Sequence, residues 1–124
     1  MAVKNPQEMH PRFVEVFNAA DLPELLALYE ATATFVPQPG QSASGIEAVR
    51  GALQQYLSLK GTLKMETTYL VESGDIALLR GKWLLQGTGP DGKPLEMRGN
   101  SVEILRRQSD GSWRFVIDHP LGAE

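Results

Sequence analysis

The sequence contains no cysteine among its 124 residues, which excludes a disulfide framework, a thiol nucleophile and a metal site built on thiolates. Histidine is scarce too, because His10 and His119 are the only two, and we expect no metal. The sequence has twelve basic and fifteen acidic residues, and the basic residues form no cluster along the chain, so nucleic acid is not an expected partner. No run approaches the roughly 20 apolar residues that span a bilayer, so no membrane partner is expected either.

The length fits one domain covering residues 1–124, and 42% hydrophobic residues are enough to build its core. The first residues lack the charged start and apolar run of a secretory signal, so we expect a cytoplasmic protein. No glycine-rich phosphate loop is present, and we expect no cofactor.

The first half of the chain has the pattern of helices. Asn5-Pro6-Gln7-Glu8 has the composition of a helix start, although Pro11 indicates that the helix bends there or begins near His10. Asp21-Leu22-Pro23-Glu24 predicts a second helix start, with an apolar stripe that continues to Tyr29. The first part is therefore predicted as a helical hairpin.

A short strand and a third helix follow. Residues 33–36 have strand composition, and Pro37 ends it. Ser44-Gly45-Ile46-Glu47 matches a capping box, and apolar residues recur at helical spacing up to Leu57. Gly61 is a natural left-handed residue at the end of this helix.

From residue 62 the pattern changes to strands joined by tight turns. Four strands are predicted, at residues 63–71, 76–86, 95–107 and 113–119. The two middle strands are long and contain Gly81 and Gly99, which often mark a bulge or bend. These elements predict an α+β domain whose helices cover one face of a curved antiparallel sheet, with a pocket at the open end.

Several short motifs follow one another in an order that is familiar. They are Phe17-Asn18-Ala19-Ala20-Asp21-Leu22, Phe35-Val36-Pro37, Gly45-Ile46-Glu47-Ala48-Val49-Arg50, Gly81-Lys82-Trp83, Asp110-Gly111-Ser112-Trp113 and Ile117-Asp118-His119-Pro120. In these motifs the chain resembles the SnoaL-like group of the superfamily that includes nuclear transport factor 2 and ketosteroid isomerase. The resemblance implies the cystatin-like cone of that superfamily. It does not imply one reaction, because isomerases, cyclases, dehydratases, epoxide hydrolases and binding modules share this fold.

The isomerase chemistry of that superfamily does not carry over. The resemblance maps the isomerase tyrosine onto Phe13, the base at or beside Pro37, and the second acid on or near Asn100. Because Phe and Pro can neither take nor give a proton, steroid-type isomerisation is rejected.

Two other activities of the same fold carry over in part. The limonene-type epoxide hydrolases resemble this chain in Arg98 and Asp118, but Asn100 replaces the second acid. The polyketide cyclases of the SnoaL group have a carboxylate on a late strand as their acid or base. Asp118 matches it best, and we expect it to be the catalytic residue.

Each candidate polar residue also has a simpler interpretation. Asp118 could be a strand-end carboxylate paired with an arginine; Arg98 would lower its pKa, whereas apolar surroundings would raise it. Asn100 could orient a carbonyl from the concave face or lie on the solvent face. Arg98 could lie at a surface or an interface. His119 is expected to point away from Asp118, and His10 to be a polar residue at the helix start.

The aromatic side chains could line a pocket or fill an ordinary core. Besides Asp118, Asn100 and Arg98, the residues predicted to line the pocket are Phe13, Tyr29, Phe35, Tyr56 and Trp83. The favoured function is binding of a small apolar or carbonyl-containing molecule, with Asp118 as acid or base. The alternative is a non-catalytic binding or dimerisation module, with a homodimer formed through the outer sheet face. We expect that face to carry Leu85, Ser101, Glu103 and Leu105.

Overall fold

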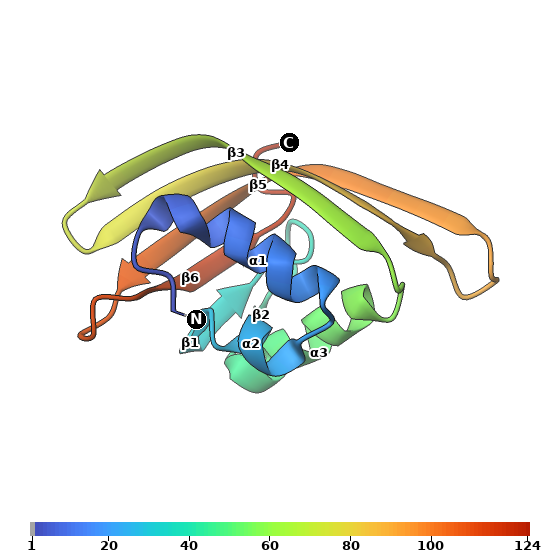
Figure 1. Ribbon diagram of the computed structural model, residues 1–124, viewed down its shortest axis with the longest axis horizontal. Helices are drawn as coiled ribbons and strands as arrows, with labels where there is room; N and C mark the ends of the chain where they lie inside the picture. The colour runs from blue at the N-terminus through green and yellow to red at the C-terminus, as the bar shows by residue number, and fades with distance from the viewer. Residues whose placement is uncertain (1) are drawn as a thin grey trace.

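The computed structural model describes residues 2–124 and has the predicted α+β architecture. Its elements, in chain order, are η1 (Pro6–Glu8), α1 (Met9–Asn18), α2 (Leu22–Leu26), β1 (Tyr29–Phe35), β2 (Ala43–Ser44), α3 (Ile46–Leu57), β3 (Thr62–Ser73), β4 (Ile76–Thr88), β5 (Pro94–Arg107) and β6 (Trp113–His119). Figure 1 shows β3, β4 and β5 arching over the three α-helices. Within this described range, no helix combines the length and the apolar character that a membrane crossing requires.

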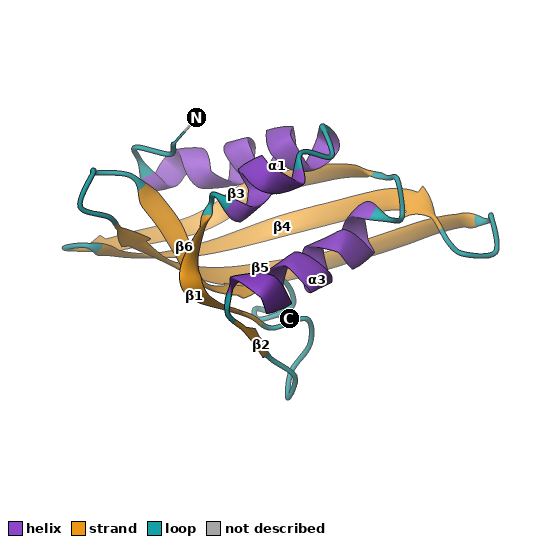
Figure 2. Cartoon of the chain, turned by 90° about the horizontal axis from the view of Figure 1, so that it is seen from below, coloured by secondary structure: helices purple, strands orange, loops and turns teal. Residues whose placement is uncertain are grey.

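The strands form one six-stranded sheet in the order β2-β1-β6-β5-β4-β3. The last four strands make the predicted antiparallel meander, whereas β1 pairs with β6 in parallel. The helices lie across one face of this curved sheet, as Figure 2 shows from below. That face becomes the inner face, and the opposite one is left uncovered by helices.

The helix starts follow local chemistry in two cases and depart from it in one. Because α1 begins at Met9, Pro11 lies in the first turn, where a missing N–H breaks no helical hydrogen bond. Asp21 caps α2, since its Oδ1 accepts a hydrogen bond from the Glu24 N–H at 3.2 Å. The capping box expected for α3 is wrong, because Ser44 lies in β2 and Gly45, at φ 92°, precedes the helix without a side-chain cap.

Two further local predictions are corrected by the structure. Tyr29 does not extend the second helix, because α2 ends at Leu26 and Tyr29 begins β1. The left-handed residue after α3 is Lys60, at φ 50°, and not Gly61. Gly61 is required for another reason, since a Cβ there would lie 2.4 Å from the backbone oxygen of Gln86.

The core lies between the helices and the inner face of the sheet. Side chains alternate along β4, so Leu79, Trp83 and Leu85 are buried while Arg80 and Lys82 are exposed. The register of the β4–β5 hairpin then places Ser101 and Glu103, among others, on the inner face. The outer face expected to carry Leu85, Ser101, Glu103 and Leu105 is therefore wrong, because all four are buried beneath the sheet.

Two irregularities shift the alternation within the sheet. The register of β3 against β4 shifts between Thr67 and Tyr69, after which Tyr69 is exposed on the outer face. The register of β5 against β6 shifts between Ile104 and Leu105. As a result Phe115 and Asp118, three residues apart, are both buried, and Asp118 points to the inner side.

Candidate active-site cavity

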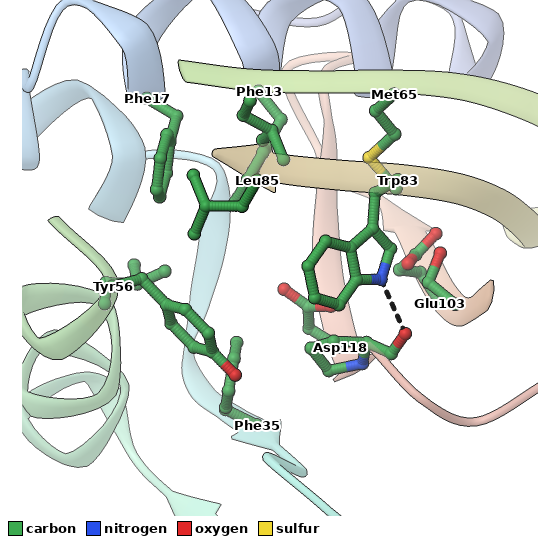
Figure 3. A pocket seen from close by; sticks show the side chains of 13 residues that line it. Phe13, Phe17, Phe35, Tyr56, Met65, Trp83, Leu85, Glu103 and Asp118 are labelled. Atoms are coloured by element: carbon green, nitrogen blue, oxygen red, sulfur yellow. Dashed lines mark hydrogen bonds between the residues drawn. The ribbon is translucent and has the colours of Figure 1, made fainter. Parts of the chain in front are cut away.

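A cavity of about 60 Å³ lies between the inner face of the sheet and the helices α1 and α3. Its walls are mostly apolar and aromatic, and its two carboxyl side chains are Glu103 from β5 and Asp118 from β6, both labelled in Figure 3. The lining residues are Phe13, Phe17, Phe35, Leu53, Tyr56, Leu63, Met65, Trp83, Leu85, Ser101, Glu103, Asp118 and Pro120. Four of the predicted aromatic residues are thus at the cavity, whereas Tyr29 is not part of its lining; their part in ligand binding stays a prediction.

Aromatic contacts hold the walls in place. The rings of Phe13 and Phe17 on α1 stack with centroids 5.9 Å apart, and those of Phe35 and Tyr56 lie 6.1 Å apart. Trp83 projects from β4 and donates its indole N–H to the Pro120 backbone oxygen at 2.8 Å, the dashed line in Figure 3. These rings form a preshaped apolar enclosure around the polar groups.

Asp118 is one of two buried acids in this enclosure. It lies near the end of β6, is only 6% exposed, and its Oδ2 accepts a hydrogen bond from the Tyr29 hydroxyl at 2.5 Å. Burial, and next the charge of Glu103, raise the pKa of Asp118 to about 8, although the Tyr29 hydrogen bond acts in the opposite direction. At neutral pH this carboxyl is therefore mostly protonated and can donate a hydrogen bond or a proton.

Two tyrosines accompany Asp118. Burial is the main cause that raises the pKa of Tyr29 well above its ordinary value, followed by the charge of Asp118, so Tyr29 remains a hydrogen-bond donor. Burial also raises the pKa of Tyr56, on α3, with a further contribution from Asp118. Tyr56 lines the cavity, and Figure 3 shows its ring at the cavity wall. Its hydroxyl stays protonated and can donate a hydrogen bond.

Sequence reasoning missed two polar residues of this region. His10 was expected to be a polar residue at the helix start, but it is 1% exposed and its Nε2 lies 2.5 Å from Glu103 Oε1. Its Nδ1 lies 2.7 Å from the Thr67 hydroxyl oxygen. Arg80 and Lys82 are exposed, so the alternate residues of β4 point inward. The hairpin register pairs those inward residues with Ser101 and Glu103, so this alternation could have predicted that Glu103 is buried.

Arg98 and Asn100 do not lie at this cavity. Both are exposed on the outer face of β5, where Arg98 binds Glu96 and the Asn100 side-chain amide donates to Glu124 at 3.1 Å. The expectation that Asn100 shares the concave face with Asp118 is therefore wrong, because strand alternation directs the two side chains to opposite sides.

The outward position of Arg98 settles two further points. No Arg98–Asp118 pair lowers the pKa of the acid, and apolar surroundings raise it instead. The arginine and carboxylate of the epoxide hydrolase arrangement are not brought together.

His119 points away from Asp118, as strand alternation predicts. Among residues 2–124, no group of three or more His, Asp or Glu side chains is arranged to hold a metal ion.

Comparison with known proteins identifies the family of the chain. A family model described as a SnoaL-like domain matches residues 11–116. No curated protein matches the sequence significantly. Many solved structures share the fold.

Three solved structures illustrate the likeness. A ketosteroid isomerase-like protein from Erwinia carotovora atroseptica has a TM-score of 0.77 at 19% identity, over 89% of this chain and 87% of its own. A nuclear transport factor 2-like protein with a cystatin-like fold, from Novosphingobium aromaticivorans, has a TM-score of 0.73 at 15% identity, over 95% and 80%. A Thiobacillus denitrificans protein, provisionally described as a calcium/calmodulin-dependent protein kinase type II association domain, has a TM-score of 0.76 at 17% identity, over 98% of both chains. At such identities the likeness shows the cystatin-like fold alone.

Proposed function

We propose that this chain, which belongs to the SnoaL-like domain family, binds a small, largely apolar molecule with a carbonyl or hydroxyl group and transfers a proton through Asp118. The observation that carries the proposal is the position of Asp118, buried in an aromatic cavity with its pKa raised to about 8. General acid–base catalysis works best when the pKa of the group lies near the working pH.

The surroundings of Asp118 fit a ligand carbonyl. A protonated carboxyl donates to a carbonyl oxygen, and the Tyr56 hydroxyl is a second donor on the cavity wall. The aromatic rings would enclose the carbon skeleton, and Tyr29 would hold the Asp118 carboxyl in one orientation through its hydrogen bond. Proton transfer of this kind serves isomerisation, cyclisation or hydration.

Deuterium exchange tests the proposal without a known substrate. The protein is incubated in D₂O with small cyclic ketones, and incorporation of deuterium next to the carbonyl is followed by NMR. In this exchange the ionised form of Asp118 would take the proton next to the carbonyl and return a deuteron to the same carbon, while the Tyr56 hydroxyl donates to the carbonyl oxygen. We expect exchange above the uncatalysed rate and a loss of at least about 100-fold in Asp118→Asn. Asn100→Ala, on the opposite face, is the matched control and should exchange like the unchanged protein. Ketones that bind without exchange would support the non-catalytic alternative.

The alternative is a binding or dimerisation module, and the outer sheet face favours its second part. Tyr69, Val71 and Ile117 are 53%, 44% and 38% exposed there, in place of the residues first expected. The likeness to a protein described as an association domain agrees with such a use of the fold. We propose a homodimer that forms through this face. We also propose that the protein is located in the cytoplasm.

Light scattering tests the dimer. The unchanged chain should have twice the mass of one copy at micromolar concentration, and Val71→Glu should have the mass of one copy. Glu66→Gln, on the same strand but away from the apolar side chains, should leave the mass unchanged. A monomer in the unchanged protein would contradict the proposal.

A further inference from the structure

The cavity contains a second carboxylate that the proposed proton transfer does not use. Glu103 on β5 lies directly opposite Asp118 on β6 in the strand register, and both side chains line the cavity. Glu103 is only 2% exposed. Cross-strand neighbours on one face have Cβ atoms about 5 Å apart, so two negative charges here would repel strongly.

Glu103 has a partner that Asp118 lacks. The His10 ring lies between Glu103 Oε1, 2.5 Å from Nε2, and the Thr67 hydroxyl oxygen, 2.7 Å from Nδ1. A protonated imidazole can donate to both oxygens at once. The absence of a side chain at Gly81 makes room for the ring, since a Cβ there would lie 2.9 Å from His10 Cε1. Elements α1, β3, β4 and β5 therefore fix the ion pair together.

We propose that Glu103, held as a carboxylate by His10, is a positioning residue that keeps Asp118 protonated and restricts the cavity to neutral ligands. The Glu103 carboxylate lies directly opposite Asp118, whereas His10 contacts Glu103 and not Asp118, so ionisation of Asp118 would place two negative charges side by side in a buried site. An anionic ligand would place a further negative charge beside the same carboxylate. The part about ligands rests on the proposed function, whereas the part about Asp118 does not.

The other groups that face Asp118 do not supply this effect. Tyr29 from β1 donates to the carboxyl, and Tyr56 from α3 is neutral at physiological pH. His10 on α1 contacts Asp118's neighbour and not Asp118 itself. Among the lining residues there is no lysine or arginine. Glu103 is thus the one charged side chain of the described lining that acts directly on Asp118.

Carbon-13 NMR of the side-chain carboxyls tests the proposal without any ligand. In Glu103→Gln, which keeps the size of the side chain, the Asp118 titration should move to lower pH by about one unit or more. Ser101→Ala is the matched control, because it lies on the same strand and in the same cavity but changes no charge. In this variant the Asp118 titration should not move. An unchanged titration in Glu103→Gln would overturn the proposal.

A second measurement needs no variant and therefore does not depend on how Glu103→Gln folds. At pH 7 the Glu103 carbon should have the chemical shift of a carboxylate, and both His10 ring nitrogens should have the shifts of an imidazolium, because the ring lies between two oxygens at hydrogen-bond distance. A protonated Glu103 or a neutral His10 would overturn the proposal.

Ligand preference is tested with two probes of similar shape, 2-cyclohexenone and cyclohex-1-ene carboxylate, at pH 7. The unchanged protein should bind the ketone at least about tenfold more tightly, and Glu103→Gln should narrow the difference. Equal binding of both probes to the unchanged protein would overturn the restriction to neutral ligands. If neither probe binds, the proposed function fails, and the titrations still decide the role of Glu103.

Discussion

The two faces of the same sheet treat acidic side chains in opposite ways. On the inner face, burial and a neighbouring carboxylate raise the pKa of Asp118 to about 8. On the outer face, Glu96 lies beside Arg98 in water, and hydrogen bonds from Arg98 and Gln86 lower its pKa. The residue type is similar and the strands are adjacent, so the difference arises from the side of the strand on which each residue lies.

A shift of one residue in strand register would therefore change the chemistry of this protein. Arg98 and Asn100 are one position out of phase with Ser101 and Glu103 on β5, and none of their polar groups reaches the cavity.

The largest effect should be the pH dependence that Asp118 gives to stability. Its pKa is about 8 in the folded chain, against 3.8 in the unfolded chain, so the folded state binds the extra proton in between. The stabilising contribution is complete below pH 3.8 and is lost as the pH rises to about 8. At about 1.4 kcal/mol per unit, the unfolding free energy relative to Asp118→Asn should fall by up to about 6 kcal/mol.

Urea unfolding of both proteins at several pH values measures this fall. Glu96→Gln on the outer face is the control and should show no such loss of relative stability with rising pH. Parallel pH profiles for the unchanged protein and Asp118→Asn would contradict the account of the inner face.

Two neighbouring leucines on β4 compare the faces by packing alone. Leu79 is fully buried on the inner face, and Leu78 is half-buried on the outer one. Leu79→Ala should lower the unfolding free energy by about 3 kcal/mol, because a cavity remains, and Leu78→Ala by about 1 kcal/mol or less. The two losses are compared under conditions in which the unfolding free energy does not depend on protein concentration. Equal losses would contradict the placement of Leu79 on the inner face and Leu78 on the outer face. A larger loss for Leu78→Ala at high protein concentration would indicate the proposed dimer.

A smaller effect is expected from two tyrosines on opposite faces. Tyr29→Phe removes the hydroxyl that donates to Asp118 and should cost about 1 kcal/mol. It should also raise the pKa of Asp118 further, because that hydrogen bond favours the ionised carboxyl. Tyr69→Phe, on the outer face, should change neither quantity. Thermal unfolding and carboxyl NMR measure the two effects, and identical behaviour of the variants would be the contrary result.

The smallest effect is expected for Arg98→Ala. Its ion pair with Glu96 is exposed to water, so the unfolding free energy should change by no more than about 0.5 kcal/mol. The pKa of Glu96 should rise toward its ordinary value. A shift in the Asp118 titration in this variant would mean that Arg98 reaches the cavity, against the observed geometry.

Much of the fold could be predicted from the sequence because its turns and caps are locally encoded. The turn at residues 90–93 and the glycines at Gly74 and Gly111 define the meander, and all four of its strands were predicted to within a few residues. The helix start at Asp21 is equally local. Tyr29 was misplaced because an apolar residue after a short helix fits the helical stripe as well as the following strand.

The candidate site was harder to predict because it depends on which face each strand presents. The alternation of Arg80 and Lys82 with buried residues, carried across the hairpin, would have placed Glu103 inside. The register of β5 against β6 shifts next to the Leu105–Phe115 pair, and this shift lets both Phe115 and Asp118 point inward. The sequence pattern does not indicate this shift. The burial of His10 depends on space left by Gly81, a contact between distant segments that periodicity does not encode.

Titration of the Asp118 carboxyl in the unchanged protein shows whether the inner face holds a protonated acid at neutral pH. The side-chain carbon is followed by carbon-13 NMR from pH 3 to pH 10, and Asp118→Asn identifies its signal. A midpoint near pH 8 is the result the inner-face environment predicts. A midpoint near pH 4, the value of an ordinary aspartate, would contradict both the protonated acid in the cavity and the function proposed for it.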